Sequence, residues 1–232
     1  MSLRESWDAN AEAWIGWARG EAGGVHTDHF FWRFGLPETL ALLPEPGRLT
    51  LDLGCGEGRL SRVLADRGHH VVGVEASPRL VEAARDAAPD IEVHVADAGD
   101  LPLDDGAADL VVASMVLMNL DDLDGAMHEV ARVLGPGGRF VASLVHPFNS
   151  PKAGNYFQPL AYPEERVRGG LSMTFHDLHR PLSAYALALE RAGLLIEAIR
   201  EPVPSDEYVA GHREVTRWRS EPCLMLLRAR RP

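Results

Sequence analysis

The chain has 232 residues, of which 46% are hydrophobic and 25% charged, and its formal net charge is −11. This length suffices for one α/β domain with a sizeable core, and the acidic balance argues against a nucleic-acid backbone as partner. No apolar run reaches the roughly 20 residues needed to span a bilayer. The start of the chain lacks the apolar core of a signal peptide, and two cysteines suit a reducing compartment, so we expect a single cytoplasmic domain over residues 1–232 without a membrane partner.

From Leu49 onward, strand-like apolar runs alternate with helix-like ones, which indicates a mostly parallel sheet covered on both faces. The expected helices run from Glu57 to Arg67, from Pro78 to Ala87 behind a Ser77 cap, from Asp121 or Asp122 to the Gly-Pro-Gly-Gly break at 135–138, and around Leu182 to Leu189. Seven strands are expected, at residues 49–53, 71–74, 91–95, 109–114, 139–145, 194–199 and 223–227.

Two segments do not fit this alternation. Residues 1–45 carry Trp7, Trp14 and Trp17, and this helical extension either packs on the sheet or forms a lid over the ligand. Residues 146–180 separate the fifth strand from the next helix, and connections this long are usually functional or disordered. We interpret them as an acceptor-side cap insertion. Its aromatic residues suggest either an acceptor pocket or a small core of the insertion itself, and they are Tyr156, Phe157 and Tyr162.

A glycine turn follows the first expected strand, with the spacing G-x-G-x-G at Gly54, Gly56 and Gly58. Such a turn lets a ligand lie against bare backbone where a Cβ atom would clash. A dinucleotide fingerprint, G-x-G-x-x-G, requires a glycine at position 59, which is Arg59 in this chain. Cys55 inside the turn is interpreted as a small buried side chain and not as a nucleophile.

Acidic residues end the next two strands, where open α/β sheets bind their ligands. Glu75 can accept two hydrogen bonds from a ribose diol, or it is a solvated strand-end carboxylate. Asp97 with Ala98 can pair with an adenine amino group and a ring nitrogen, or Asp97 only initiates the turn ahead of Gly99.

Five segments in this order resemble the motifs of class I S-adenosylmethionine (SAM) dependent methyltransferases, at residues 52–58, 74–77, 96–102, 109–114 and 129–138. The set is similar to the small-molecule branch typified by ubiquinone and menaquinone methyltransferases (methyltransferase type 11). The resemblance implies a Rossmann-like, doubly wound sheet whose last strand is antiparallel. It also implies SAM as cofactor and S-adenosylhomocysteine as product. The stretch from Asn119 to Asp121 departs from the His-containing version of relatives, so Asn119 is assigned no role.

The resemblance also implies a cofactor-binding set. Asp52, Gly54 and Gly56 would lie along the methionine part of SAM, Glu75 would hold the ribose hydroxyls, and Asp97 and Ala98 would contact the adenine. Ser114 or Met115 would form the strand-four side of the pocket, and Cys55 and Ala76 complete the set.

Because SAM is already an activated electrophile, the protein mainly aligns a nucleophile behind the methyl group and excludes water. When the acceptor is a hydroxyl or an acidic carbon a proton must leave, and histidine is a common recipient. His146 and His179 are the predicted catalytic residues, each with the alternative of a structural role, and His176 is a weaker candidate. Asp177 is a candidate to orient either His176 or His179. The pairs His26-x-x-His29 and His176-x-x-His179 have metal-like spacing, but no cysteine or acidic set completes a site, so we predict no metal.

The predicted function is methyl transfer from SAM to a small-molecule acceptor. Two alternatives remain open, a SAM-binding protein without methyl transfer activity and a nicotinamide-dependent oxidoreductase on a related fold. The sequence leaves the accepting atom (oxygen, nitrogen or carbon) and the oligomeric state open, because acceptor specificity resides in the variable segments.

Overall fold

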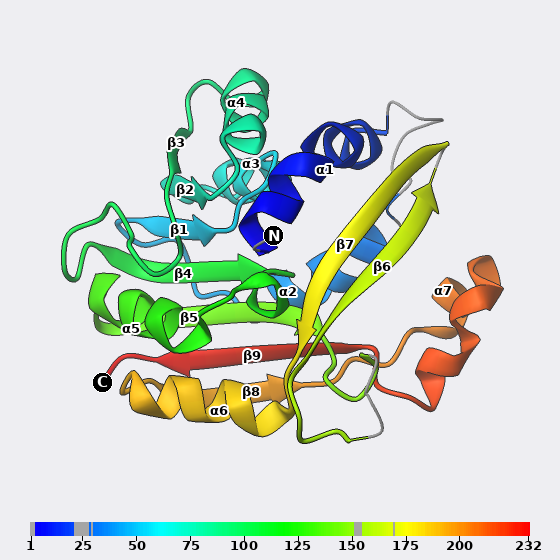
Figure 1. Cartoon of the computed structure of the whole chain (residues 1–232). Helices are drawn as coiled ribbons and strands as arrows, with labels where there is room; N and C mark the ends of the chain where they lie inside the picture. Colours follow the sequence, from blue (N-terminus) through cyan, green and yellow to red (C-terminus); the bar gives the residue numbers. More distant parts are fainter. Residues whose placement is uncertain (1–2, 21–27, 29, 151–154, 169) are drawn as a thin grey trace.

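Seven strands form the central sheet of the computed structural model, and a separate two-stranded hairpin rises beside it (Figure 1). The structure describes residues 3–20, 28, 30–150, 155–168 and 170–232. The sheet strands are β1 (Thr50–Leu53), β2 (Val71–Glu75), β3 (Glu92–Val95), β4 (Ala108–Ser114), β5 (Leu134–Val145), β8 (Leu195–Arg200) and β9 (Leu224–Arg230), and the hairpin strands are β6 (Leu160–Arg168) and β7 (Leu171–His179).

The longer helices are α1 (Leu3–Ala18), α3 (Arg59–Asp66), α4 (Pro78–Ala87), α5 (Leu123–Val133) and α6 (Leu182–Arg191). Shorter helical segments are η1 (Phe30–Gly35), α2 (Leu36–Leu40), η2 (Leu117–Asn119), α7 (Asp206–Gly211) and η3 (Arg213–Arg219). In the described part of the chain, every helix is too short or too polar to cross a bilayer.

The strand order of the sheet is β3-β2-β1-β4-β5-β9-β8. The pairs from β3 to β5 are parallel, whereas β9 is antiparallel to both β5 and β8. These pairings confirm the predicted doubly wound, seven-stranded sheet with an antiparallel last strand. The chain builds outward in opposite directions from β1 and β4, and the crevice at such a reversal is where folds of this kind bind ligands.

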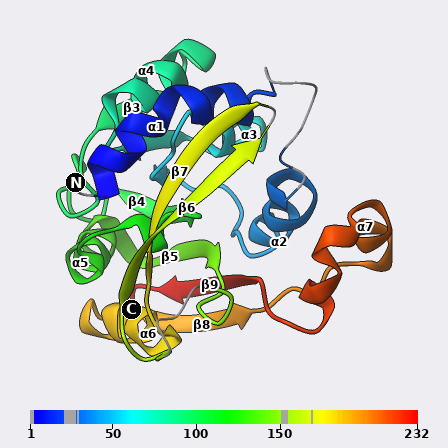
Figure 2. The same ribbon diagram turned by 45° about the vertical axis from the view of Figure 1, so that its right-hand side comes forward.

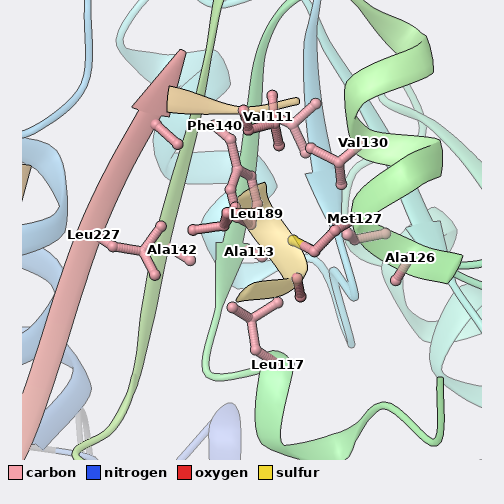
Figure 3. Close-up of a cluster of buried hydrophobic side chains, with 14 of the residues drawn as sticks. Val111, Ala113, Leu117, Ala126, Met127, Val130, Phe140, Ala142, Leu189 and Leu227 are labelled. Carbon is pink, nitrogen blue, oxygen red and sulfur yellow. The ribbon is translucent and has the colours of Figure 1, made fainter. Parts of the chain in front are cut away.

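Alternate residues of β4 face opposite helical layers, as the pleat of a strand requires. Val111 and Ala113 lie in a buried cluster with side chains of α5 and α6, and Leu110 and Val112 lie in a second cluster with side chains of α2 and α3. Figure 3 shows the first cluster, which includes Phe140 of β5. Full burial of each such side chain contributes about 1.5–3 kcal/mol, so these clusters fix the sheet between its helical layers.

Two predicted helix starts are confirmed by their capping hydrogen bonds. The Ser77 hydroxyl accepts from Leu80 N–H at 3.3 Å, with Pro78 as the first residue of α4. The Asp122 carboxylate accepts from Gly125 N–H at 2.9 Å at the start of α5. Both side chains satisfy a backbone donor that has no partner inside its helix.

The helix α5 ends at Val133, before the Gly-Pro-Gly-Gly stretch as predicted, but the predicted strand start at Arg139 is wrong, because β5 begins directly at Leu134. Gly137 N–H donates to Arg231 O at 2.9 Å, and Arg231 N–H donates to Gly138 O at 2.9 Å. The glycine-rich stretch therefore continues as strand because the distant end of the chain supplies its hydrogen-bond partners.

Residues 160–179 form the β6–β7 hairpin, whose antiparallel register runs from Leu160 opposite His179 to Arg168 opposite Leu171. The hairpin rises from the β5 side of the sheet and passes alongside α1 (Figure 2). The strand β7 of the hairpin and the helix α1 therefore lie together over one end of the sheet, which positions both for the site described next.

Candidate functional site

The glycine turn after β1 is tied to the end of β2 by backbone hydrogen bonds. Gly54 N–H and Cys55 N–H both donate to Val74 O, at 2.7 and 3.0 Å. Gly56 N–H donates to Glu75 Oε2 at 3.1 Å. The left-handed backbone of Gly54 and Gly56, with φ of 67° and 58°, permits this tight path.

Gly54→Ala is expected to lower the free energy of unfolding by about 2–4 kcal/mol, because a Cβ there combines positive-φ strain with overpacking. That Cβ would lie 2.5 Å from a methyl carbon of Val116. Gly193→Ala is the matched control, since Gly193 has a φ of 73° but no atom within 4 Å of its added Cβ. Urea unfolding of both variants separates the clash from the backbone strain, and equal losses would contradict the close approach at Gly54.

Glu75 and Asp52 are acidic side chains beside this turn. Glu75 Oε1 accepts from Ser77 N–H at 2.9 Å while Oε2 accepts from Gly56, and burial raises the pKa of this carboxyl against those bonds. Asp52 Oδ2 accepts from Ser61 Oγ at 2.6 Å. Burial also raises the pKa of Asp52 to about 7, and the charge of Glu75 adds to that rise. The two carboxyl groups therefore favour a ligand that carries positive charge.

The remaining predicted cofactor residues lie at the ends of β3 and β4. Asp97 is exposed and accepts from Gly99 N–H at 2.9 Å, which is the turn-initiating bond, and its neighbour Ala98 is half-buried. Ser114 Oγ lies 3.2 Å from Ser143 Oγ. Met115 has a φ of 60°, in the left-handed region that costs a side chain about 1–2 kcal/mol, and its N–H donates to Ser143 O at 2.7 Å. Such strain is frequent at ligand-binding sites.

Cys55 packs against the neighbouring strand. Its side chain is buried, and a Cβ on Gly73 would lie 2.9 Å from its sulfur. Burial raises the pKa of this thiol well above its ordinary value, so the group stays protonated and unreactive at neutral pH. These features agree with its interpretation as a small buried side chain.

A cavity of about 1100 Å³ lies beyond the carboxyl ends of β1, β2 and β4. The structure brings together all of the predicted cofactor-binding residues on its lining: Asp52, Gly54, Cys55, Gly56, Glu75, Ala76, Asp97, Ala98, Ser114 and Met115. Typical small-molecule sites occupy about 300–1,000 Å³, so this cavity exceeds the usual range for one ligand and can hold two only if their sites are of the smaller kind.

The helix α1 closes one side of the cavity through contacts with distant segments. Asp8 Oδ1 accepts from Ser77 Oγ at 2.5 Å, and Arg19 donates to Ala83 O at 2.6 Å. The Asn10 amide donates to Thr174 O at 2.7 Å and accepts from Thr174 N–H at 3.1 Å. The helix is therefore seated on both α4 and the free edge of β7.

Aromatic rings line the inner side of α1 and β7. The ring centroids of Trp7 and Trp14 are 5.4 Å apart, and Phe175 lies 5.5 Å from Trp7 and 5.9 Å from Trp14. All three side chains line the cavity. The rings meet edge to face and together provide an aromatic wall on this side of the cavity.

The predicted catalytic histidines are buried away from this cavity lining. His146 Nε2 lies 2.8 Å from Glu201 Oε1, and its Nδ1 accepts from Phe148 N–H at 3.1 Å. His179 contacts Ser150 Oγ at 2.5 Å through Nδ1 and Tyr156 O at 2.8 Å through Nε2. Neither ring is among the described residues that line the cavity, so a catalytic role for either histidine stays a prediction.

The remaining candidates from the sequence are His176, the histidine pairs with metal-like spacing and the aromatic residues of the insertion. The ring of His176 bonds to Ser6 Oγ and so connects β7 to α1. The pair His26 and His29 lies outside the described residues, and within them no group of three His, Cys, Asp or Glu side chains is arranged to hold a metal. Tyr162 lines the cavity, whereas Phe157 is 76% exposed.

Sequence reasoning missed a polar group on the cavity wall formed by Asn119, Tyr162 and Asp177. Asn119 Nδ2 donates to Asp177 Oδ1 at 2.5 Å, and the hydroxyl of Tyr162 also hydrogen-bonds to this carboxylate. Tyr162 and Asp177 are directly opposite each other in the hairpin. The alternation of Leu171, Met173 and Phe175 with the more polar Ser172, Thr174 and His176 was the available sign of a strand here.

Comparisons with known proteins agree with this geometry. A family model described as a methyltransferase domain matches residues 51–142. A demethylmenaquinone methyltransferase of Beutenbergia cavernae is 38% identical over 165 residues, which are 68% of this chain and 68% of that protein. An uncharacterized methyltransferase of Mycobacterium tuberculosis is 41% identical over 98 residues, covering 42% of this chain and 40% of that protein.

A crystal structure of an S-adenosylmethionine dependent methyltransferase from Mesorhizobium loti superposes with a TM-score of 0.69 and 28% identity, over 84% of this chain and 96% of that one. The chain therefore belongs to the SAM-dependent methyltransferases with a class I fold. The chain spans only part of the length of several other curated relatives that it matches, from 31% to 50%.

Proposed function

We propose that this chain transfers a methyl group from SAM to a small-molecule acceptor, with both molecules bound in the 1100 Å³ cavity. The observation that carries the proposal is the pair of carboxyl groups beside the glycine turn, of which Asp52 is buried and Glu75 half-buried. SAM brings a sulfonium and an ammonium group, whose positive charges this environment favours. The pyrophosphate of a nicotinamide dinucleotide would bring negative charge to the same place, and Arg59 replaces the glycine that its binding turn requires.

We propose the placement of SAM that the family resemblance implies, and the lining of the cavity supports it. Asp52 and the glycine turn face the methionine part, Glu75 and Ala76 the ribose, and Asp97 with Ala98 the adenine. Ser114 and Met115 then stand at the methyl end. We further propose that α1 and the β6–β7 hairpin form the lid, which excludes water when both ligands are bound.

The remaining cavity holds the acceptor. One relative is named a demethylmenaquinone methyltransferase, and its similarity over 68% of both chains supports a fused-ring acceptor. The aromatic wall of Trp7, Trp14 and Phe175 offers ring faces and edges against which such rings can pack. The chain's acidic net charge of −11 supports an enzyme that acts without a nucleic-acid partner. Its two free cysteines suit the reducing cytoplasm, which is the location that we propose.

Bound SAM supplies the activated methyl group, and the residues of this chain bind it, orient it and exclude water. Alignment of the accepting atom behind the methyl carbon at about 3–3.5 Å contributes several kcal/mol to lowering the barrier. Asp52 and Glu75 must release the cofactor after methyl transfer, when the sulfur of the cofactor no longer carries a positive charge. The neutral product is therefore expected to bind with fewer favourable charge contacts than SAM does.

Glu75→Gln is expected to weaken SAM binding more than tenfold, because the amide cannot accept from both backbone N–H groups and the ribose. Calorimetric titration with SAM, S-adenosylhomocysteine and NADH measures the effect. Glu92→Gln on β3, whose side chain is 65% exposed, is the matched control and should bind as the wild type does. Unchanged SAM affinity in Glu75→Gln would remove the ribose assignment.

The same titration separates the alternatives. Binding of SAM and S-adenosylhomocysteine without NADH supports the methyltransferase proposal, and binding of NADH alone supports the oxidoreductase. SAM binding with no methylated product from a broad acceptor screen, read by mass spectrometry, would favour a SAM-binding protein without methyl transfer activity.

A further inference from the structure

Asp177 has features that the cofactor does not account for. Its side chain is 9% exposed, yet it lines the cavity on the hairpin side. Asn119 and Tyr162, which both line the cavity too, direct hydrogen-bond donors at its carboxylate. An ionised carboxylate has about four acceptor sites, so these two donors leave room for a third.

The carboxylate is held in a fixed position by its partners. Asn119 Nδ2 also donates to His176 O at 3.2 Å, which locks the amide between η2 and β7. The cross-strand pairing places Tyr162 opposite Asp177 on the hairpin. Burial and the charge of Glu164 raise the pKa of Asp177, so the group takes up a proton more readily than an exposed carboxylate does.

The surroundings of Asp177 define the kind of molecule that fits. Phe175, two residues before it, joins Trp7 and Trp14 in the aromatic wall. Glu164 on the neighbouring strand is already paired with Arg166. An acceptor with its own negative charge would be repelled here, whereas a neutral ring with a hydrogen-bond donor satisfies both the wall and the carboxylate.

We infer that Asp177 binds the hydroxyl group of an aromatic acceptor and takes its proton as the methyl group is transferred. This inference rests on the proposed function. It adds that the acceptor is an aromatic molecule with a hydroxyl group and that Asp177 is the base. The hydroxyl oxygen forms a bond to the methyl carbon, and the carbon–sulfur bond breaks with its electron pair going to sulfur. The hydroxyl proton passes to the Asp177 carboxylate and later to solvent. The products are an aryl methyl ether and neutral S-adenosylhomocysteine.

The first experiment compares 2-naphthol with 2-fluoronaphthalene, which has a similar shape but no hydroxyl donor. Calorimetry on protein saturated with S-adenosylhomocysteine should show 2-naphthol binding at least tenfold more tightly. This preference should shrink as the pH is lowered and Asp177 becomes protonated, and it should be absent at every pH in Asp177→Ala. A wild-type preference near one, or a preference that persists in Asp177→Ala, would overturn the inference.

The second experiment measures conversion of 2-naphthol to 2-methoxynaphthalene by mass spectrometry. Asp177→Asn, which preserves volume but cannot take the proton, should lower kcat at least 100-fold while leaving the KM for SAM unchanged. Asp124→Asn, on the exposed side of α5, is the control and should turn over as the wild type does. Equal kcat in wild type and Asp177→Asn, or no product from the wild type, would overturn the proton-transfer step.

The two levels of proposal fail in different ways. Loss of S-adenosylhomocysteine binding in the wild type would contradict the proposed function itself. Normal cofactor binding together with an absent hydroxyl preference would contradict only the role of Asp177. Binding of the cofactor by a variant shows that this variant has folded. If Asp177→Ala does not fold, the binding comparison is made with Asp177→Asn instead.

Discussion

Asp52→Asn is expected to stabilise the ligand-free protein at pH 8 by about 2–4 kcal/mol and to weaken SAM binding more than tenfold. The Asp52 side chain is 1% exposed, and burial raises its pKa to about 7. At pH 8 the folded protein must therefore hold a buried negative charge, which the amide removes. The bond from Ser61 Oγ can still be accepted by the amide oxygen. The same substitution deletes the charge that faces the cationic part of the cofactor.

The pH dependence has a definite sign. An unfolded aspartate titrates near pH 4, so between about pH 4 and pH 7 the folded state binds the extra proton. Stability of the wild type relative to Asp52→Asn is then highest in acid and falls as the pH rises through about 7. SAM affinity changes in the opposite direction, since the cation prefers the ionised carboxylate that prevails above this pKa.

Urea unfolding at pH 5 and pH 8, together with SAM titration at the same two values, measures both effects. Asp66→Asn, at the exposed end of α3, is the control and should change neither quantity. A wild type as stable as Asp52→Asn at both pH values would show that the buried charge carries no penalty.

Arg180→Lys is expected to lower the free energy of unfolding by about 3 kcal/mol or more. The Arg180 guanidinium is buried at the base of the hairpin and donates to three carbonyls of the segment around η2: Leu117 O at 3.3 Å, Leu120 O at 2.5 Å and Asp121 O at 3.2 Å. The ammonium group of lysine is more compact than a guanidinium, so it cannot donate to all three carbonyl oxygens. Those that it does not reach lose their hydrogen-bond donor. Because Asn119 belongs to this segment, acceptor binding should weaken as well.

Arg191→Lys is the matched control, because Arg191 pairs with Asp124 at 2.7 Å on the surface with 59% of its side chain exposed. Exposed pairs of this kind contribute about 0–1 kcal/mol, so its unfolding curve should stay close to that of the wild type. A similar small loss in Arg180→Lys would mean that water replaces the guanidinium at the η2 carbonyls.

Features set by neighbouring residues were predictable from the sequence. The strand runs, the caps at Ser77 and Asp122, and the turn at Gly54 and Gly56 depend on local periodicity and on side-chain bonds a few residues apart. The cofactor lining followed from them, because parallel strands bring their carboxyl ends to one edge of the sheet.

Features set by distant partners were not predictable in the same way. The start of β5 depends on Arg231, and the fixed position of Asp177 depends on Asn119, 58 residues earlier. The sequence drew attention to His146 and His179 because histidine is common in proton transfer, yet it contained no information on Glu201 or Ser150, which occupy their rings. Only the fold decides which polar side chains meet.

The contacts that hold α1 in place also affect the order in which the chain folds. The partners of this helix and of Arg19 directly after it are Ser77, Ala83 and Thr174, which lie 64 to 164 residues away along the chain. Closing such long loops is entropically costly until the sheet and hairpin exist to receive the helix. The helix α1 therefore docks after the sheet and the hairpin have formed, and its local release leaves the sheet intact. Exchange of spent cofactor for fresh SAM can then proceed by undocking one helix while the sheet stays folded.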